Sequence, residues 1–107
     1  MTRAVVDPGI CGKTVTIEVI RVGKRRVRIQ ITSDCEKVTK LGESCIELDQ
    51  WEALKPQVDS QVYKCASECR LHGACPVPMA ILKAVEVEAG LALPRPVHLY
   101  FETTEQE

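Results

Sequence analysis

The chain has 107 residues, of which 45% are hydrophobic and 27% are charged, and its formal net charge at pH 7 is −1. This composition is ordinary for one folded domain and excludes a globally disordered chain. The balanced charge and the presence of only one Trp, two Tyr and one Phe argue against nucleic-acid binding, which uses positive surfaces and stacking side chains. We predict a single domain over residues 1–107, with a frayed tail at 103–107.

The first residues, "MTRAVVDPGICG", lack the apolar stretch of about 7–15 residues that characterises a signal peptide. No apolar run reaches the ~20 residues that a membrane-spanning helix needs. We therefore expect a cytoplasmic protein without a membrane segment. Six cysteines in a reducing compartment indicate metal ligands, redox thiols or small core residues in preference to disulfides.

Two amphipathic strands are predicted in the first third of the chain. A short apolar run at 4–6 stops at the turn signal "DPG". Apolar and polar residues then alternate over 14–20 and again over 26–31, with a basic turn near Gly23 and Lys24 between them. Alternation with this period is typical of half-buried strands, and the short turn joins them as a β-hairpin.

The pattern changes to a helical period after the hairpin. Ser33 and Glu36 form an S-x-x-E capping box, which predicts a helix that begins at Ser33. One stripe of this helix has apolar residues at helical spacing: Val38, Leu41, Cys45 and Leu48. The segment 49–60 is predicted as a connection, because Pro56 prevents a continuous helix across it.

Two further helices and a final strand complete the predicted fold. One helix runs from residue 59 or 60 to 71. Another begins at Cys75, has Pro76 in its first helical position and ends at Gly90. The segment "RPVHLYFE" at 95–102 is predicted as an edge strand. These elements make an α+β domain: a mainly antiparallel sheet of three to four strands with two to three helices packed on one face.

The six cysteines separate into two groups by their places in the predicted elements. Cys45 lies within a helical stripe and Cys65 lies on an apolar helix face, so both are interpreted as core residues. The other four lie at predicted element boundaries: Cys11, Cys35, Cys69 and Cys75. Cys35 and Cys75 begin helices, where free amide groups stabilise a thiolate. Because helices that follow strands begin at one end of a sheet, we expect the fold to bring these four thiols together.

Four boundary thiolates are typical ligands of an iron–sulfur cluster or of zinc. Structural zinc usually shows paired C-x(2–4)-C knuckles, which this chain lacks, whereas "CP" also ends the ligand run of bacterial ferredoxins. We therefore predict an iron–sulfur cluster, of the [4Fe–4S] type, held by Cys11, Cys35, Cys69 and Cys75. Cys65 and His72 are further candidate ligands, although a histidine at a helix end also bonds free carbonyl groups.

Two segments, "VRIQITSDCEKVTKL" and "HGACPVPMAILKAVEVEAG", resemble the C-terminal domain of NifU-type iron–sulfur scaffolds. In that domain a strand leads into a cysteine-bearing turn and then a helix, and the cysteines hold a cluster. The resemblance implies such a role for Cys75 and the helix that follows it. Over nearly the whole chain, "PGICG", "SDCE" and "HGACPVPMAILKA" are similar to a family of short uncharacterised proteins of anaerobic microbes. An oxygen-free setting suits an exposed cluster.

The leading hypothesis is a small iron–sulfur protein that serves electron transfer, sensing or cluster delivery, with a redox or cluster-acceptor protein as its partner. Three alternatives stay open: a structural zinc-binding module that uses the same cysteines, a thiol enzyme with Cys75 or Cys35 as nucleophile and His72 as base, and a cysteine-rich domain without metal. A binding role is favoured over an enzymatic one, because no substrate or oxyanion site accompanies the thiols. The basic run "GKRRVR" is interpreted as a solvated hairpin face.

Overall fold

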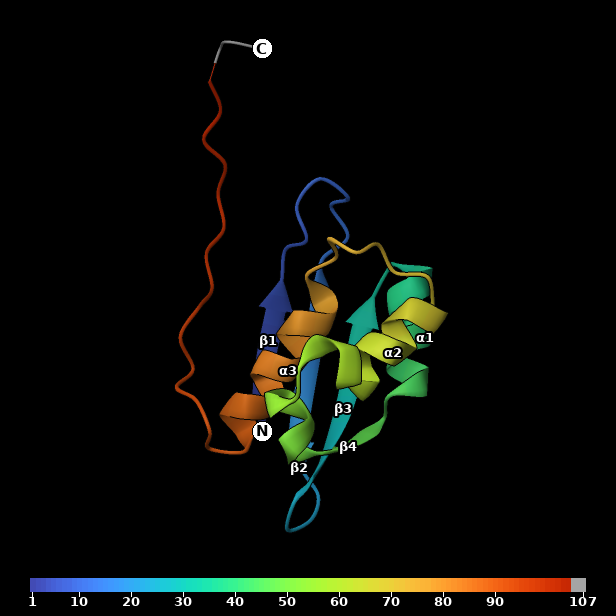
Figure 1. Ribbon diagram of the computed structural model, residues 1–107, viewed down its shortest axis with the longest axis vertical. Helices are drawn as coiled ribbons and strands as arrows, with labels where there is room; N and C mark the ends of the chain where they lie inside the picture. The colour runs from blue at the N-terminus through green and yellow to red at the C-terminus, as the bar shows by residue number, and fades with distance from the viewer. Residues whose placement is uncertain (105–107) are drawn as a thin grey trace.

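A computed structural model describes residues 1–104 of the chain, and Figure 1 shows how its sheet and helices are arranged. In chain order the elements are β1 Thr2–Val6, β2 Val15–Arg21, β3 Arg26–Ser33, α1 Glu36–Ser44, β4 Glu47–Asp49, α2 Gln61–Glu68 and α3 Val77–Glu88. Two 3-10 turns, η1 Gln50–Leu54 and η2 Gln57–Asp59, connect β4 to α2. The predicted α+β class, with an antiparallel sheet and three helices, is confirmed.

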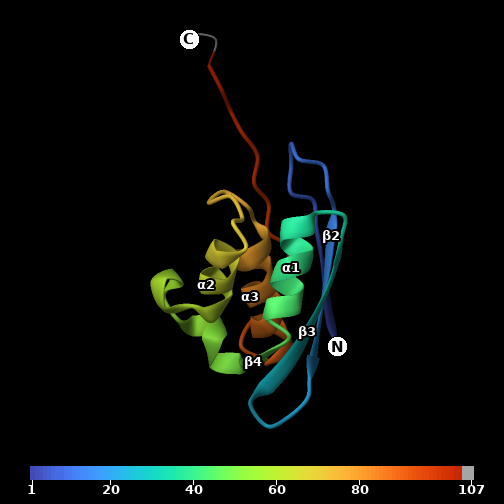
Figure 2. The same cartoon turned by 90° about the vertical axis from the view of Figure 1, so that its right-hand side faces the viewer.

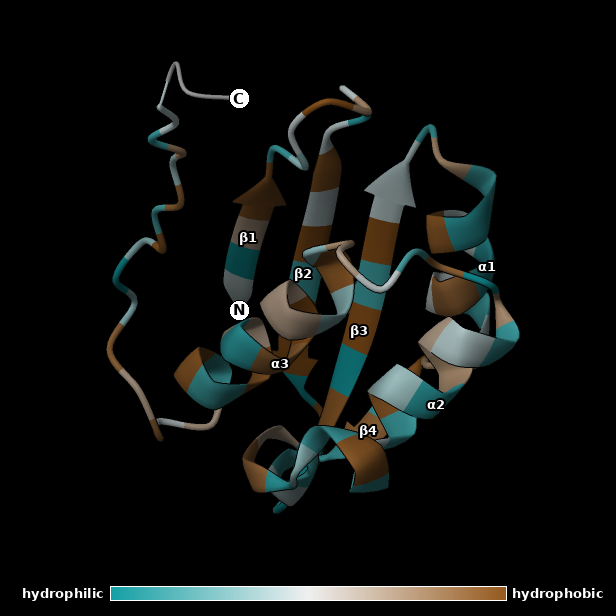
Figure 3. Ribbon diagram, turned by 45° about the horizontal axis from the view of Figure 1, so that its top comes forward, coloured by the Kyte–Doolittle hydropathy of each residue, from teal (hydrophilic) through white to brown (hydrophobic). Residues whose placement is uncertain are grey.

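The four strands form one antiparallel sheet in the order β1-β2-β3-β4. Arg21 pairs with Val27 next to the turn at Gly23 and Lys24, so the predicted hairpin is confirmed. Along β2 and β3, buried side chains alternate with exposed or half-buried ones, and Figure 3 shows the matching alternation of hydrophobic and hydrophilic bands. One face of the sheet therefore supplies the core, and the other faces solvent.

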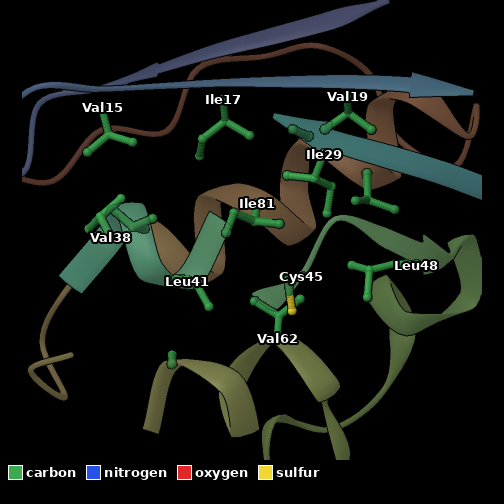
Figure 4. Packing of buried hydrophobic residues seen from close by; sticks show 14 of the residues in the cluster. Val15, Ile17, Val19, Ile29, Val38, Leu41, Cys45, Leu48, Val62 and Ile81 are labelled. Atoms are coloured by element: carbon green, nitrogen blue, oxygen red, sulfur yellow. The ribbon is translucent and has the colours of Figure 1, made fainter. Parts of the chain in front are cut away.

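All three helices lie on the same side of the sheet (Figure 2). α3 packs on β1 and β2, α1 packs on β3, and α2 lies against α1 and α3 as an outer layer. Figure 4 shows the core between these layers, to which the sheet contributes Ile17 and Ile29, α1 contributes Leu41 and α3 contributes Ile81. All four side chains are almost completely buried. Burial of an aliphatic side chain of this size contributes roughly 1.5–3 kcal/mol.

The first helix begins later and ends earlier than predicted. α1 begins at Glu36 with Cys35 as its N-cap, so the predicted start at Ser33 is wrong. Ser33 is the last residue of β3, and its hydroxyl accepts a hydrogen bond from the Cys35 amide at 3.0 Å. This local bond replaces the capping box, because it uses the Ser33 oxygen before the helix starts. The helix ends at Ser44, and Leu48 is buried on β4 and not on the helix.

The predicted second helix is present but shorter. α2 ends at Glu68, because Arg70 takes a left-handed conformation with φ of 60° that stops the helix before residue 71. Ser60 caps its start by accepting a hydrogen bond from the Tyr63 amide at 3.3 Å. The segment 49–60, predicted as a connection, contains the two short 3-10 turns.

The predicted third helix is confirmed with a shift of its start. α3 begins at Val77, which makes Pro76 its N-cap and not its first helical residue. The chain leaves the helix at Gly90, whose φ of 76° lets the Leu91 amide donate to Glu86 O at 2.8 Å. In residues 1–104 no helix combines the length and the apolar composition that crossing a membrane requires.

The C-terminal segment departs most from its prediction. Residues 95–102, predicted as an edge strand, pair with no strand in the described part of the chain. They form an exposed, extended segment that leaves the end of α3 and projects beyond the sheet (Figure 1). The alternation of apolar and polar residues shows that this segment suits a β-strand. It does not show whether a sheet edge lies close enough for the segment to pair with. Of the predicted frayed tail at 103–107, residues 105–107 lie outside the described residues.

One carboxylate ties the end of α3 to the sheet. Glu88 Oε1 accepts a hydrogen bond from Thr2 Oγ1 at 2.7 Å, and Oε2 accepts one from the Arg21 amide at 3.1 Å. The Met1 amino group lies 3.5 Å from Oε1. Burial raises the pKa of Glu88, but these partners outweigh burial and hold the pKa below its ordinary value of 4.5.

Glu88→Ala should lower the free energy of unfolding by about 1–3 kcal/mol at pH 7, because two donors lose a charged acceptor. A carboxylate whose pKa is lower in the folded state stabilises the fold above its unfolded pKa and loses that contribution as the pH falls. The difference from the wild type should therefore shrink below about pH 4.5. Urea unfolding at neutral and acidic pH measures both effects. Glu43→Ala, on the exposed side of α1, is the control. If the difference in unfolding free energy between Glu88→Ala and the wild type were the same at neutral and acidic pH, this account would be contradicted.

Candidate functional site

Three of the predicted ligand cysteines lie on elements that meet at one end of the molecule. Cys11 is in the loop between β1 and β2, Cys35 precedes α1, and Cys75 precedes α3. Figures 1 and 2 both show the 7–14 loop, the start of α1 and the start of α3 at the end opposite the β2–β3 turn. The antiparallel register produces this arrangement, because β1 ends, β2 begins and β3 ends at that side of the sheet.

Cys35 is the N-cap residue of α1 and is half-buried against the core. Its amide donates to Ser33 Oγ, but among the described residues the Cys35 side chain makes no capping hydrogen bond to the first amides of the helix. An N-cap side chain normally accepts a hydrogen bond from one of those amides. A thiolate at Cys35 would have these unpaired amides and the positive end of the helix dipole beside it.

Cys75 lies at the start of α3, beside a cavity. Its amide donates to His72 O at 3.0 Å, which closes a turn before the helix. Pro76 and Pro78 lack amide hydrogens, and the N-cap residue Pro76 has no polar side-chain atom that could cap α3. A cavity of about 190 Å³ lies next to this turn and is lined by Tyr63, Ser67, Leu71, His72, Cys75 and Pro78, among others. Cys75 and His72 therefore share one cavity, and Cys69 does not line it.

Cys11 lies in an exposed turn between β1 and β2. Gly9 and Gly12 have φ values of 91° and 70°, a region that is readily open only to glycine. The Gly12 amide donates to Gly9 O at 2.9 Å and closes the turn around Ile10 and Cys11. Since residues 9–14 are all exposed, the loop holds the Cys11 thiol outside the core.

The remaining three cysteines gather between α1 and α2. Cys45, the C-cap of α1, is 1% exposed and lies beside Val62 (Figure 4), so its predicted core position is confirmed. Cys65 on α2 and Cys69 at its C-cap are half-buried. Burial, a side-chain hydrogen bond with Cys65 and smaller effects of Cys69 and Glu52 raise the pKa of Cys45 to about 12. Such a thiol is protonated at neutral pH, which is unfavourable for a metal ligand.

These positions divide the predicted ligand set. Cys11, Cys35 and Cys75 lie on elements at one end of the sheet, whereas Cys69 lies near Cys45. Within residues 1–104, no three side chains of His, Cys, Asp or Glu are arranged so that they could hold a metal ion. The predicted ligands are therefore not preassembled.

The contact between Cys45 and Cys65 is a feature that sequence reasoning does not find. It depends on how α1 crosses α2, and no local pattern specifies that crossing. The four-residue spacing of Cys65 and Cys69, which places both on one side of α2, is the one local signal of a shared thiol environment.

Comparison with known proteins identifies a family without an assigned activity. A family model described as "Family of unknown function (DUF6951)" matches residues 2–101. No curated protein and no solved structure matches the chain. The family match fits the predicted similarity to uncharacterised short proteins, and it gives no support to the resemblance to NifU-type scaffolds. Because the match spans nearly the whole sequence, the chain belongs to this family of unknown function, DUF6951.

Proposed function

We propose that this chain binds an iron–sulfur cluster of the [4Fe–4S] type at the end of the sheet formed by the 7–14 loop and the starts of α1 and α3. The supporting observation is the common position of these three elements, each of which carries one candidate ligand: Cys11, Cys35 and Cys75. Thiolates from three separate elements suit an iron–sulfur cluster better than they suit structural zinc, which is usually held by paired C-x(2–4)-C knuckles.

The two helix starts provide the electrostatic support. Thiolate-bound clusters carry negative charge, and N–H groups directed at their sulfur atoms tune their stability and potential. In the described chain, the N-cap side chains of α1 and α3 make no hydrogen bond to the first-turn amides of these helices. In α3, Pro76 and Pro78 carry no amide hydrogen, so Val77 and Met79 supply the amide donors of the first turn after Cys75. The dipoles of both helices add partial positive charge at the same place.

The 7–14 loop is the part that has to move to complete the site. It is exposed from Gly9 to Thr14, so it closes over the helix starts without uncovering core side chains. Structural thiolate sites bind metal with an apparent free energy of roughly 10 kcal/mol or more. That is comparable with the cost of ordering a loop of this length, at about 1–2 kcal/mol per residue. A site that forms only on binding is consistent with ligands that are not preassembled.

The fourth ligand is assigned to the segment that joins α2 to α3. Ligand type favours Cys69, because thiolates are the usual ligands of [4Fe–4S] clusters. Position favours His72, because it lines the same cavity as Cys75. Metal analysis of Cys69→Ser and His72→Ala proteins separates the two, since only the true ligand's loss lowers the iron content.

A cluster at this end suits exchange of electrons or of the cluster itself. With Cys11 in an exposed loop, one side of the bound cluster lies near solvent and within reach of another protein. We therefore propose a role in electron transfer, sensing or cluster delivery, with a redox or cluster-acceptor protein as partner. A reducing, oxygen-poor cytoplasm would keep the thiols and the cluster intact.

Anaerobic purification tests the proposal directly. The protein should be brown, should absorb broadly near ~400 nm and should contain iron and acid-labile sulfide in equal amounts. A colourless protein with about one zinc per chain would replace this proposal with the zinc-binding module. A protein that holds no metal after reconstitution with iron and sulfide would overturn both and leave a cysteine-rich domain without metal.

A further inference from the structure

The C-terminal segment exposes a row of apolar side chains. Val97 is 57% exposed, Leu99 81% and Phe101 83%. These residues alternate with others that point to the opposite side of an extended chain, which is the period of a strand with one apolar face. No hydrogen bond joins residues 96–104 to the remainder of the described chain. An apolar row that no other described segment covers is typical of an interaction surface.

The sheet has a free edge that matches this segment. β1 pairs with β2 on one side, and no strand of the described chain pairs with its other side. Ala4 and Val6 of β1 pack against the core and are still only partly buried. A strand added at this edge, with its apolar face toward the helices, would cover both side chains and extend the sheet.

The segment of the same chain has the wrong direction for this edge. Because Glu88 is hydrogen-bonded to Thr2, the chain leaves α3 near the first residue of β1, and Figure 1 shows the C-terminal segment running in the same direction as β1. Pairing within one chain would therefore be parallel, in a sheet whose strand pairs are all antiparallel. With Leu99 opposite Ala4, parallel pairing also places Glu102 opposite Asp7, and like charges across a strand pair are destabilising.

We propose that the free edge of β1 binds segment 96–101 of a second copy of this chain, and that the exchange is reciprocal. A two-fold axis perpendicular to β1 reverses the partner's segment, so the pairing becomes antiparallel like the remainder of the sheet. Each copy then buries the apolar row of the other, and the edge of β1 is paired in both copies.

The antiparallel register brings apolar side chains together and avoids a like-charge contact. Three apolar positions face the core side of β1, in the pairs Leu99 with Ala4, Val97 with Val6 and Phe101 with Thr2. On the opposite side of the sheet, Tyr100 of one copy lies across from Arg3 of the other, a favourable cation–π arrangement. Asp7 of the other copy lies across from Pro96, so the like-charge contact between Asp7 and Glu102 of the parallel pairing is absent.

Molar mass in solution tests the exchange. In the presence of a thiol reductant, the wild-type protein should have twice the chain mass of 11.9 kDa. The double variant Leu99→Asp/Phe101→Asp should be a monomer, and Val58→Asp, which changes an equally exposed apolar residue on η2, should stay a dimer. If the wild-type protein is a monomer at the highest soluble concentration, the proposal is overturned. Slow amide exchange at 97–101 in such a monomer would indicate that the segment pairs with β1 of its own chain. A dimer that survives the double variant overturns the proposal as well.

Charge reversal tests the antiparallel register. Asp7 lies across from Pro96 in the antiparallel register, so Asp7→Arg should leave dimerisation unchanged. In a parallel pairing Asp7→Arg would instead relieve the repulsion with Glu102 and strengthen association. Dimerisation that tightens on Asp7→Arg overturns the register.

Discussion

Cys75→Ser should abolish binding of the proposed iron–sulfur cluster in a protein that stays folded. A serine hydroxyl is a poor ligand of cluster iron, because it does not ionise as a thiol does. In the anaerobically purified variant, iron and acid-labile sulfide should fall to background, and the absorption near ~400 nm should disappear. The same loss is expected for Cys35→Ser and Cys11→Ser, since all three residues lie on elements that meet at one end of the sheet. Far-ultraviolet circular dichroism checks that the fold is kept.

Two control variants separate ligand loss from general damage. Cys45→Ala should keep the full metal content, because Cys45 is buried away from that end of the sheet, and should cost on the order of 1–2 kcal/mol of stability through a small cavity. Pro76→Ala should also keep the metal, but should shift its potential or its rate of release, because it adds an amide next to the Cys75 sulfur. A Cys75→Ser protein with full metal content would show that the segment 69–78 bears no ligand.

The alternation and spacing of apolar residues predicted the strands and helices whose buried faces depend on nearby residues in the sequence. The alternation of Val15, Ile17 and Val19 survives in the structure as the buried face of β2. Leu48 shows the limit of this reasoning. Its spacing from Cys45 suits a helix, but a chain that turns after Ser44 and returns as β4 buries the same side chain. A spacing therefore identified a core residue without identifying the element that carries it.

The end of the chain and the candidate site depend on contacts that are distant in sequence. The pattern at 97–101 has the period of a strand, but a strand also needs a partner edge in the right direction, which β1 of the same chain does not offer. Helix starts placed Cys35 and Cys75 at one end of the sheet, as we expected. The position of Cys69 near Cys45 follows from how α2 packs on α1, and no spacing along the chain specifies that packing.

Alkaline pH should destabilise the fold because the Cys45 thiol resists ionisation in the folded state. This loss of stability should exceed the cost of the cavity that Cys45→Ala creates. The pKa of its thiol is raised from 9.0 to about 12, first by burial and then by its hydrogen bond with Cys65. A group whose folded pKa is raised stabilises the fold fully below its unfolded pKa and loses that contribution as the pH rises toward the folded pKa. Between about pH 9 and pH 12 the unfolded thiol ionises and the folded thiol does not, so the wild type should lose on the order of 4 kcal/mol.

Cys45→Ala should therefore change from a destabilising to a stabilising substitution as the pH rises. At pH 7 it should cost on the order of 1–2 kcal/mol through its cavity, and above about pH 10 it should be the more stable protein, because it has no thiol to ionise. Urea unfolding of the metal-free, reduced proteins at several pH values measures the difference. Val38→Ala is the matched control, since Val38 is also buried on α1 but does not titrate, so its cost should be the same at every pH. If the Cys45→Ala cost proved equally independent of pH, the Cys45 thiol would ionise as readily in the folded protein as in the unfolded chain.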